Sequence, residues 1–204
     1  MPLYLKSEAE IERMRASNQI VARILQAMRM HARPSVTTLE LDELAEGLAR
    51  RAGALPAFKG YQGAGPYPFP GTLCTSINEE VVHGIPSAKR KLQEGDILSI
   101  DCGVVLDGFY GDAAITVPIG KVSEKALRLM RVTEEALELA IRTVVPGNRI
   151  SDIGAAIQDH VEANGFSVVR DFVGHGIGRM LHEEPQVPHS VSYTHLTLPT
   201  ILLV

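Results

Sequence analysis

Two aspartates in neighbouring apolar segments offer the clearest chemistry in this chain of 204 residues. Asp101 and Asp112 lie on either side of Asp107-Gly108, and Asp-Gly between two apolar segments is typical of a two-residue β-hairpin turn. With that turn, Asp101 and Asp112 become diagonal neighbours on one face of the hairpin, where their side chains can meet. Two carboxylates at such a short distance repel each other unless they share a proton or hold a cation. A hard divalent metal ion suits carboxylate oxygens, so the pair is a candidate metal site.

The opposite face of this hairpin is apolar, and we expect it to face the hydrophobic core. If Leu106 lies opposite Phe109 in the turn, alternate residues of both strands point to that face. The residues expected there are Leu98, Ile100, Cys102, Val104, Leu106, Phe109, Ala113, Ile115 and Val117. Asp107 belongs to the turn itself, and we expect no chemical role for it.

Three histidines could add imidazole groups to the carboxylates. His83 ends a short apolar segment, His175 lies between Gly174 and Gly176, and His182 follows seven residues after His175. Glycines on both sides of a histidine indicate an unusual backbone conformation or a close approach to a ligand. Neutral imidazole is a good ligand for a divalent metal. The glycine spacing is not that of a dinucleotide-binding loop. The residues therefore point to a metal-dependent hydrolase, but their spacing alone does not give the substrate.

Local signals divide the chain into helices, hairpins, further helices and short strands, an order that predicts an α+β fold. Capping boxes at Ser7 and Thr37 predict the starts of two helices, and Ser123 and Ser151 are expected to cap two later ones. The predicted helices cover residues 7–31, 37–53, 123–144 and 151–165, and the predicted strands cover residues 73–77, 80–83, 97–106, 109–117, 166–169 and 170–173.

The composition, 45% hydrophobic and 22% charged, fits one soluble globular domain, or one domain and a fragment. A net charge of −4 gives no basic surface for nucleic acid, and no apolar stretch is long enough to span a bilayer. The N-terminal residues lack the apolar segment of a signal peptide. Cys74 and Cys102 form neither a disulfide framework nor a zinc motif. We therefore expect a soluble cytoplasmic protein with no nucleic-acid and no membrane partner.

Four motifs resemble those of bacterial type I methionine aminopeptidases. They lie at residues 75–86, 96–101, 108–112 and 174–178, within a similarity that extends from about Leu5 to Pro188. The resemblance implies the pita-bread fold, in which two pseudo-symmetric α+β halves flank a dinuclear metal site. It also implies hydrolytic removal of the initiator methionine from the N-termini of nascent polypeptides, with the ribosome as a further candidate partner.

The resemblance also assigns metal-binding roles, residue by residue. Asp101 resembles the bidentate ligand of one metal ion, Asp112 the carboxylate that bridges both ions, and His175 the imidazole ligand of the other. The expected cofactors are therefore two divalent metal ions, with Co, Mn, Fe, Zn and Ni left open. Two metals can acidify a bridging water and polarise the scissile carbonyl group.

Four further residues resemble those that contact the substrate in this family. His83 and His182 resemble the catalytic pair that stabilises the developing tetrahedral intermediate, and Tyr61 and Cys74 are expected to wall the methionine pocket. These assignments are implied by the family resemblance and do not follow from the spacing of the residues.

The chain departs from the family pattern after Pro188. The family supplies two more metal-binding glutamates from C-terminal strands, whereas residues 189–204 contain no acidic residue. We therefore expect one domain at 1–188 that lacks those strands, an unrelated tail at 189–204 and impaired catalysis. Glu183 and Glu184 adjoin His182 and are poor substitutes. Two alternatives stay open: a non-catalytic pita-bread binding protein, and a relative of the proline-specific aminopeptidases.

Overall fold

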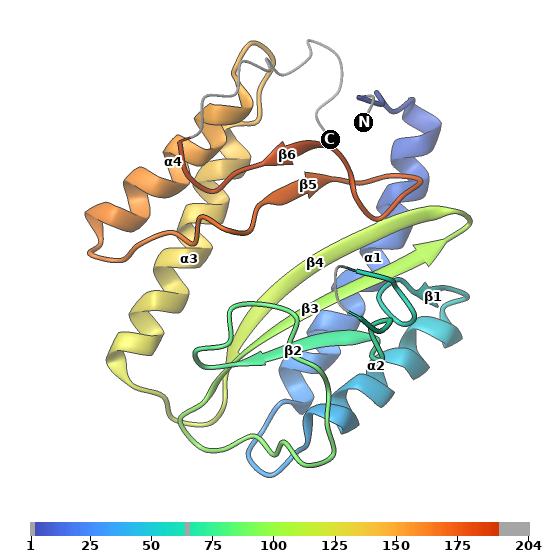
Figure 1. Cartoon of the computed structure of the whole chain (residues 1–204), viewed down its shortest axis with the longest axis vertical. Coiled ribbons are helices and arrows are strands. Elements are labelled where there is room, and N and C mark those ends of the chain that lie inside the picture. Colours follow the sequence, from blue (N-terminus) through green and yellow to red (C-terminus); the bar gives the residue numbers. More distant parts are fainter. Residues whose placement is uncertain (1–2, 64–65, 192–204) are drawn as a thin grey trace. The chain divides into compact units, whose positions relative to one another are not determined.

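The computed structural model describes residues 3–63 and 66–191, which fall into two compact units (Figure 1). The hairpin unit consists of residues 7–123 and 177–181. The helix-pair unit consists of the other described residues, namely 3–6, 124–176 and 182–191. Helices and strands are mixed in both units, so the predicted α+β class is confirmed.

Two capped helices begin the hairpin unit. Helices α1 (Glu8–His31) and α2 (Thr38–Arg51) each start with a complete capping box. The Ser7 hydroxyl accepts a hydrogen bond from the Glu10 N–H, and the Glu10 carboxylate accepts one from the Ser7 N–H in return. Thr37 and Glu40 make the same exchange. Both predicted helix starts are therefore confirmed, and each capping box supplies partners for N–H groups that the helix leaves unpaired.

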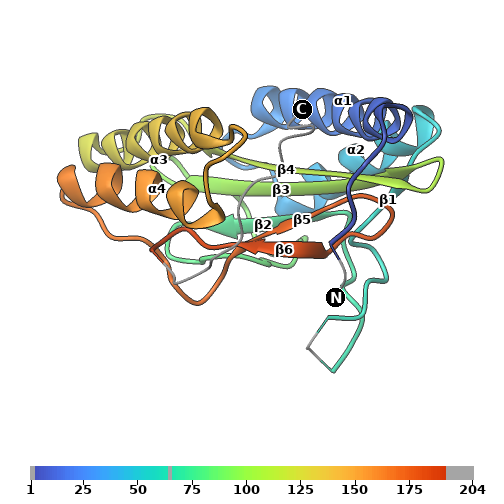
Figure 2. The ribbon, with the colours of Figure 1, turned by 90° about the horizontal axis from the view of Figure 1, so that it is seen from above.

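A four-stranded antiparallel sheet carries the two aspartates. Strand β3 (Ile97–Leu106) pairs along one edge with β4 (Phe109–Pro118) and along the other with β1 (Leu55–Pro56) and β2 (Leu73–Ile77). Figure 2 shows β3 and β4 as two long neighbouring strands.

The predicted hairpin register is confirmed. Leu106 lies opposite Phe109, so Asp107 and Gly108 form the two-residue turn. Both turn residues have positive φ angles, as a primed β-turn requires.

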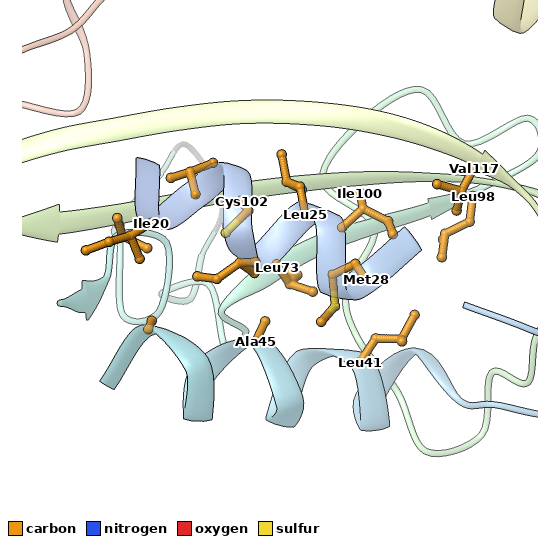
Figure 3. Packing of buried hydrophobic residues seen from close by; sticks show 14 of the residues in the cluster. Ile20, Leu25, Met28, Leu41, Ala45, Leu73, Leu98, Ile100, Cys102 and Val117 are labelled. Carbon is orange, nitrogen blue, oxygen red and sulfur yellow. The ribbon is translucent and has the colours of Figure 1, made fainter. Parts of the chain in front are cut away.

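The face opposite the aspartates packs against α1 and α2 (Figure 3). Residues Leu98, Ile100, Cys102 and Val104 of β3 are fully buried there. The helices contribute a matching apolar surface: Ile20, Val21, Ile24, Leu25, Met28, Leu41, Ala45 and Ala49. The prediction that Ala113 belongs to the core is wrong. Ala113 is exposed, on strand β4 at the outer edge of the sheet.

Helices α3 (Glu124–Thr143) and α4 (Ile150–Ala163) pack against each other in the helix-pair unit. The predicted cap at Ser151 is wrong: the N-cap residue is Arg149, whose N–H donates to the Asp152 carboxylate at 2.7 Å. The Asp152 carboxylate, three residues after the N-cap, already accepts a hydrogen bond at the start of the helix. Ser151 therefore lies within the first turn and is not the cap.

Three predicted short strands are absent from the described residues. Residues 80–83 form a loop because the Glu80 carboxylate accepts the Ile77 N–H at 2.9 Å and ends β2 there. Residues 166–173 contain no strand, and β5 (Gly174–Gly176) instead pairs with β6 (Glu183–Val187).

The predicted boundary at residue 188 and the unrelated tail at 189–204 stay predictions, since residues 192–204 lie outside the described ranges. Within the described part of that segment, the Val191 N–H donates to the Gln158 side chain of α4 at 3.0 Å.

A buried carboxylate fixes the start of β2. Asp42 of α2 is 4% exposed, and its carboxylate accepts the N–H groups of Thr72 at 2.7 Å and Leu73 at 2.8 Å. We expect Asp42→Ala to lower the free energy of unfolding by roughly 3 kcal/mol, because it leaves two buried N–H groups without acceptors. Asp42→Asn should lose clearly less, since the amide oxygen can still accept. Chemical denaturation of both variants tests this, and equal losses would contradict it.

Candidate functional site

Asp101 and Asp112 meet on the face of the hairpin unit's sheet that is opposite α1 and α2. Asp101 lies opposite Ala114 and Asp112 opposite Gly103, which makes the two carboxylates diagonal neighbours. Burial, followed by the charge of Asp112 and a hydrogen bond with its side chain, raises the pKa of Asp101 to about 8. The pair is therefore a compact, partly buried, acidic oxygen cluster. It can share a proton or, in its place, hold a cation.

This donor set fits a divalent metal ion. Hard cations are bound by carboxylate oxygens, and a cation relieves the repulsion that otherwise keeps a proton on Asp101. Within either unit, the described residues contain no cluster of three or more His, Cys, Asp or Glu side chains of the kind that would hold a metal. On the chemistry of its donor atoms, the aspartate pair is the core of a candidate metal site.

Helix α1 supports the strand that carries Asp112. The Asp112 N–H donates to the Asn18 side-chain oxygen at 3.2 Å. Gly111 lies so close to α1 that a Cβ atom on it would be 2.7 Å from the backbone nitrogen of Asn18. Asn18 was not among the predicted site residues, because a polar residue in the middle of a helix gives no sequence signal for such a contact.

An apolar wall adjoins the aspartates. Cys74 lies opposite Asp101 in the β2–β3 pairing and is 5% exposed. The Phe58 ring covers Gly103, where a Cβ atom would be 2.6 Å from the ring. The other members of this cluster are Ala57, Phe69, Tyr110, Ile177 and Leu181. Of these residues only Cys74 was predicted from the sequence, since the others come from four separate segments of the chain.

The Cys74 thiol stays protonated in these surroundings. Burial, together with the negative charges of Asp101 and Asp112, raises the pKa of this thiol to about 12. A neutral thiol is a small apolar group and not a nucleophile at neutral pH. Cys74 is therefore suited to contact a ligand and not to attack one.

Tyr61 lies beside this wall and not within it. The Tyr61 N–H donates to the Phe58 carbonyl, and the Tyr61 carbonyl accepts the Phe69 N–H, each at 2.9 Å. Its side chain is 41% exposed. The structure thus places Tyr61 at the rim of the apolar cluster.

His83 occupies an exposed loop that is fastened to β2. The residue has a φ of 61°, a left-handed conformation that is uncommon for residues other than glycine. The next residue, Gly84, holds the loop: its carbonyl accepts the Thr75 N–H at 2.8 Å, and its N–H donates to the Ser76 hydroxyl at 3.1 Å. Thr75 and Ser76 directly follow Cys74, so the loop anchors His83 to the strand that flanks Asp101.

Gly84→Ala should detach this loop. A Cβ atom on Gly84 would lie 2.6 Å from the Thr75 carbonyl carbon, and backbone atoms of a paired strand cannot move away easily. We expect a loss of about 1–3 kcal/mol in the free energy of unfolding, together with a displaced His83. Gly63→Ala is the matched control, because a Cβ atom there meets nothing within 4 Å. Thermal denaturation would contradict this reasoning if both variants lost the same stability.

His175 and His182 lie together in the helix-pair unit. Their ring centroids are 4.3 Å apart, and the rings are tilted by 56°. The His175 Nδ1 atom is 2.9 Å from the Gly176 carbonyl oxygen, which can only accept a hydrogen bond. The proton therefore belongs on Nδ1, and the lone pair that a metal needs is on Nε2.

The segment between these histidines, Ile177–Leu181, belongs to the hairpin unit. Its Gly178 carbonyl accepts the Tyr110 N–H at 2.8 Å. The Arg179 guanidinium lies 4.5 Å from the centre of the Phe109 ring and pairs with Glu10 of α1 at 3.2 Å. These contacts fasten the segment beside the strand that carries Asp112.

Comparison with known proteins agrees with this architecture. The model of metallopeptidase family M24 matches residues 12–200. A methionine aminopeptidase of Clostridium acetobutylicum is 50% identical over 187 residues, which cover 92% of this chain and 73% of that protein.

Solved structures agree as well. A methionine aminopeptidase from Thermotoga maritima superposes with a TM-score of 0.92 at 41% identity, over 97% of this chain and 78% of its own. A prolidase from Pyrococcus horikoshii has a TM-score of 0.81 at 23% identity, over 95% of this chain and 52% of its own, a likeness of fold alone. The predicted pita-bread fold is thereby confirmed. No helix among the described residues has the length and apolar character needed to cross a bilayer.

Proposed function

Because the chain belongs to metallopeptidase family M24, we propose that it is a metal-dependent aminopeptidase that removes the N-terminal methionine of newly made proteins. The observation that carries this proposal is the 50% identity to a methionine aminopeptidase over 92% of the chain. The convergence of Asp101 and Asp112 supports it from the structure, because a metal-dependent hydrolase needs clustered carboxylates.

A divalent metal cofactor follows from the family, and we propose that two ions bind. Asp101 would hold one ion through both oxygens, Asp112 would bridge the two, and His175 would contribute Nε2 to the other. The tautomer set by the Gly176 carbonyl supports the role of His175. When bound, the metals would polarise the scissile carbonyl and increase the acidity of a water molecule.

The other residues would bind and orient the peptide. We propose that His83 and His182 donate hydrogen bonds to the carbonyl oxygen on which negative charge develops. The neutral Cys74 thiol and the Phe58 ring suit a methionine side chain, since thioether sulfur makes favourable contacts with aromatic rings. Tyr61, at the rim of this wall, would contact the methionine from the solvent side.

We propose that the enzyme acts in the cytoplasm, where nascent N-termini emerge from the ribosome. The proline-specific alternative is weaker, because its solved representatives show only a likeness of fold. The non-catalytic alternative is also weaker, because the aspartates and the histidine motifs are retained.

Peptide selectivity tests the proposed function. We expect the purified chain, with added divalent metal, to act slowly, in keeping with the impaired catalysis expected from its sequence. It should nevertheless release the first residue of Met-Gly-Gly at least about tenfold faster than that of Leu-Gly-Gly, the margin that shape differences in an apolar pocket provide. Ala-Pro-Gly should not be cleaved. Preferential cleavage of Ala-Pro-Gly would instead support the proline-specific alternative.

A further inference from the structure

A buried ion pair lies beside the two histidines of the helix-pair unit. The Lys6 ammonium group donates a hydrogen bond to the Glu183 carboxylate, although 177 positions separate the residues. The Glu183 side chain is only 3% exposed and that of Lys6 17%. A carboxylate buried to this degree needs a partner, because an unpaired charge away from water is strongly disfavoured.

Glu183, which forms the ion pair with Lys6, lies next to both histidines in the β5–β6 pairing. Glu183 begins β6 directly after His182, and its strand partner is Gly176, directly after His175. The strand pairing is irregular between His175 and Gly176. Backbone hydrogen bonds are interrupted at such a bulge, so they hold the two strand ends together less firmly there.

We infer that Lys6 is a positioning residue, whose ion pair with Glu183 fixes the orientation of His182 against His175. The inference rests on the proposed function only in giving these histidines their catalytic and metal-binding roles. The Lys6 ammonium group also donates to the Tyr4 carbonyl at 3.0 Å, so it is held from its own side of the contact. Lys6 thereby holds the Glu183 carboxylate in place, and Glu183 in turn restricts the movement of His182, the residue before it.

Substitutions at both positions separate this role from general stability. Lys6→Met keeps a side chain of similar length but leaves the Glu183 carboxylate buried without its cation. Lys6→Arg keeps the cation. Combining Lys6→Met with Glu183→Gln removes both charges, so no unpaired charge stays buried. Lys59→Met is the matched control, because it removes an ion pair to Glu46 that is more exposed to solvent.

Histidine ring NMR of the full chain is the main measurement. For Lys6→Met we expect the signals of His175 and His182 to shift and their inter-ring nuclear Overhauser effect to weaken, while the signals of His31 at the exposed end of α1 stay in place. Lys6→Arg and the double variant should restore the inter-ring effect, and Lys59→Met should not change it.

Kinetics provide a second measurement. Lys6→Met should lower kcat for methionine release roughly tenfold or more and leave KM nearly unchanged, because misplaced catalytic groups slow the reaction more than they weaken binding. The inference is overturned if Lys6→Met leaves both histidine signals and their inter-ring effect unchanged, or if Lys6→Arg and the double variant fail to restore them. If the unmodified chain released no methionine, the proposed function would fail, whereas the NMR result would still decide the role of Lys6.

Discussion

Replacing Asp101 with Asn should make the metal-free protein more stable at neutral pH. The substitution removes one of two adjacent carboxylates whose repulsion is relieved only by a proton or a cation. We expect the free energy of unfolding at pH 8 to rise by an amount on the order of a few kcal/mol. A substitution that stabilises the protein while removing a functional group is the expected behaviour of a strained active site.

The pH dependence of stability provides the sharper form of this prediction. The pKa of Asp101 is raised to about 8 in the folded chain, from an ordinary value of 3.8. Between these values the folded state keeps a proton that the unfolded state has lost. The free energy of unfolding should therefore fall as pH rises from about 4 to about 8. Asp101→Asn should flatten that slope.

Denaturation in the presence of a chelator, at pH 5 and pH 8, measures both effects. Asp107→Asn is the matched control, since Asp107 lies in the exposed turn of the same hairpin and Asn tolerates its positive φ. The interpretation that Asp101 and Asp112 repel each other would be refuted by either of two results. One is an Asp101→Asn variant that is no more stable than the parent chain at pH 8. The other is a variant whose free energy of unfolding falls with pH as steeply as that of the parent chain.

Asp112→Asn should weaken divalent metal binding by more than about 100-fold, because residues that merely support metal ligands already contribute about 10–100-fold. An amide oxygen carries no net charge, so it cannot replace a bridging carboxylate. Asn18→Ala should have the smaller effect, since Asn18 supports only the backbone of Asp112. Isothermal titration with manganese or cobalt would measure both. Unchanged affinity in Asp112→Asn would remove this residue from the proposed site.

The features predicted correctly from sequence are those that local interactions determine. The Asp107-Gly108 turn fixes the hairpin register, and the alternation of side chains then places Asp101 and Asp112 on one face. The capping boxes at Ser7 and Thr37 also act within four residues of each other.

The features that sequence analysis missed depend on tertiary packing. The loop that carries His83 is held by hydrogen bonds to β2 and not by strand pairing of its own residues. Phe58 and Leu181 approach the aspartate face from distant segments, and Asn18 of α1 contacts the strand that carries Asp112. Each is an ordinary residue in its local sequence. Their roles become visible only when the elements are packed together.

Metal-dependent methionine release by the purified 204-residue chain tests the proposed function most directly. Met-Gly-Gly would be incubated with the chain at a concentration comparable to that of the peptide, with manganese or cobalt in one sample and with a chelator in the other. We expect free methionine to form with the metal, and to form neither with the chelator nor with the Asp112→Asn variant. Methionine release that is no faster with the metal than with the chelator would contradict the proposal that this chain is a metal-dependent methionine aminopeptidase.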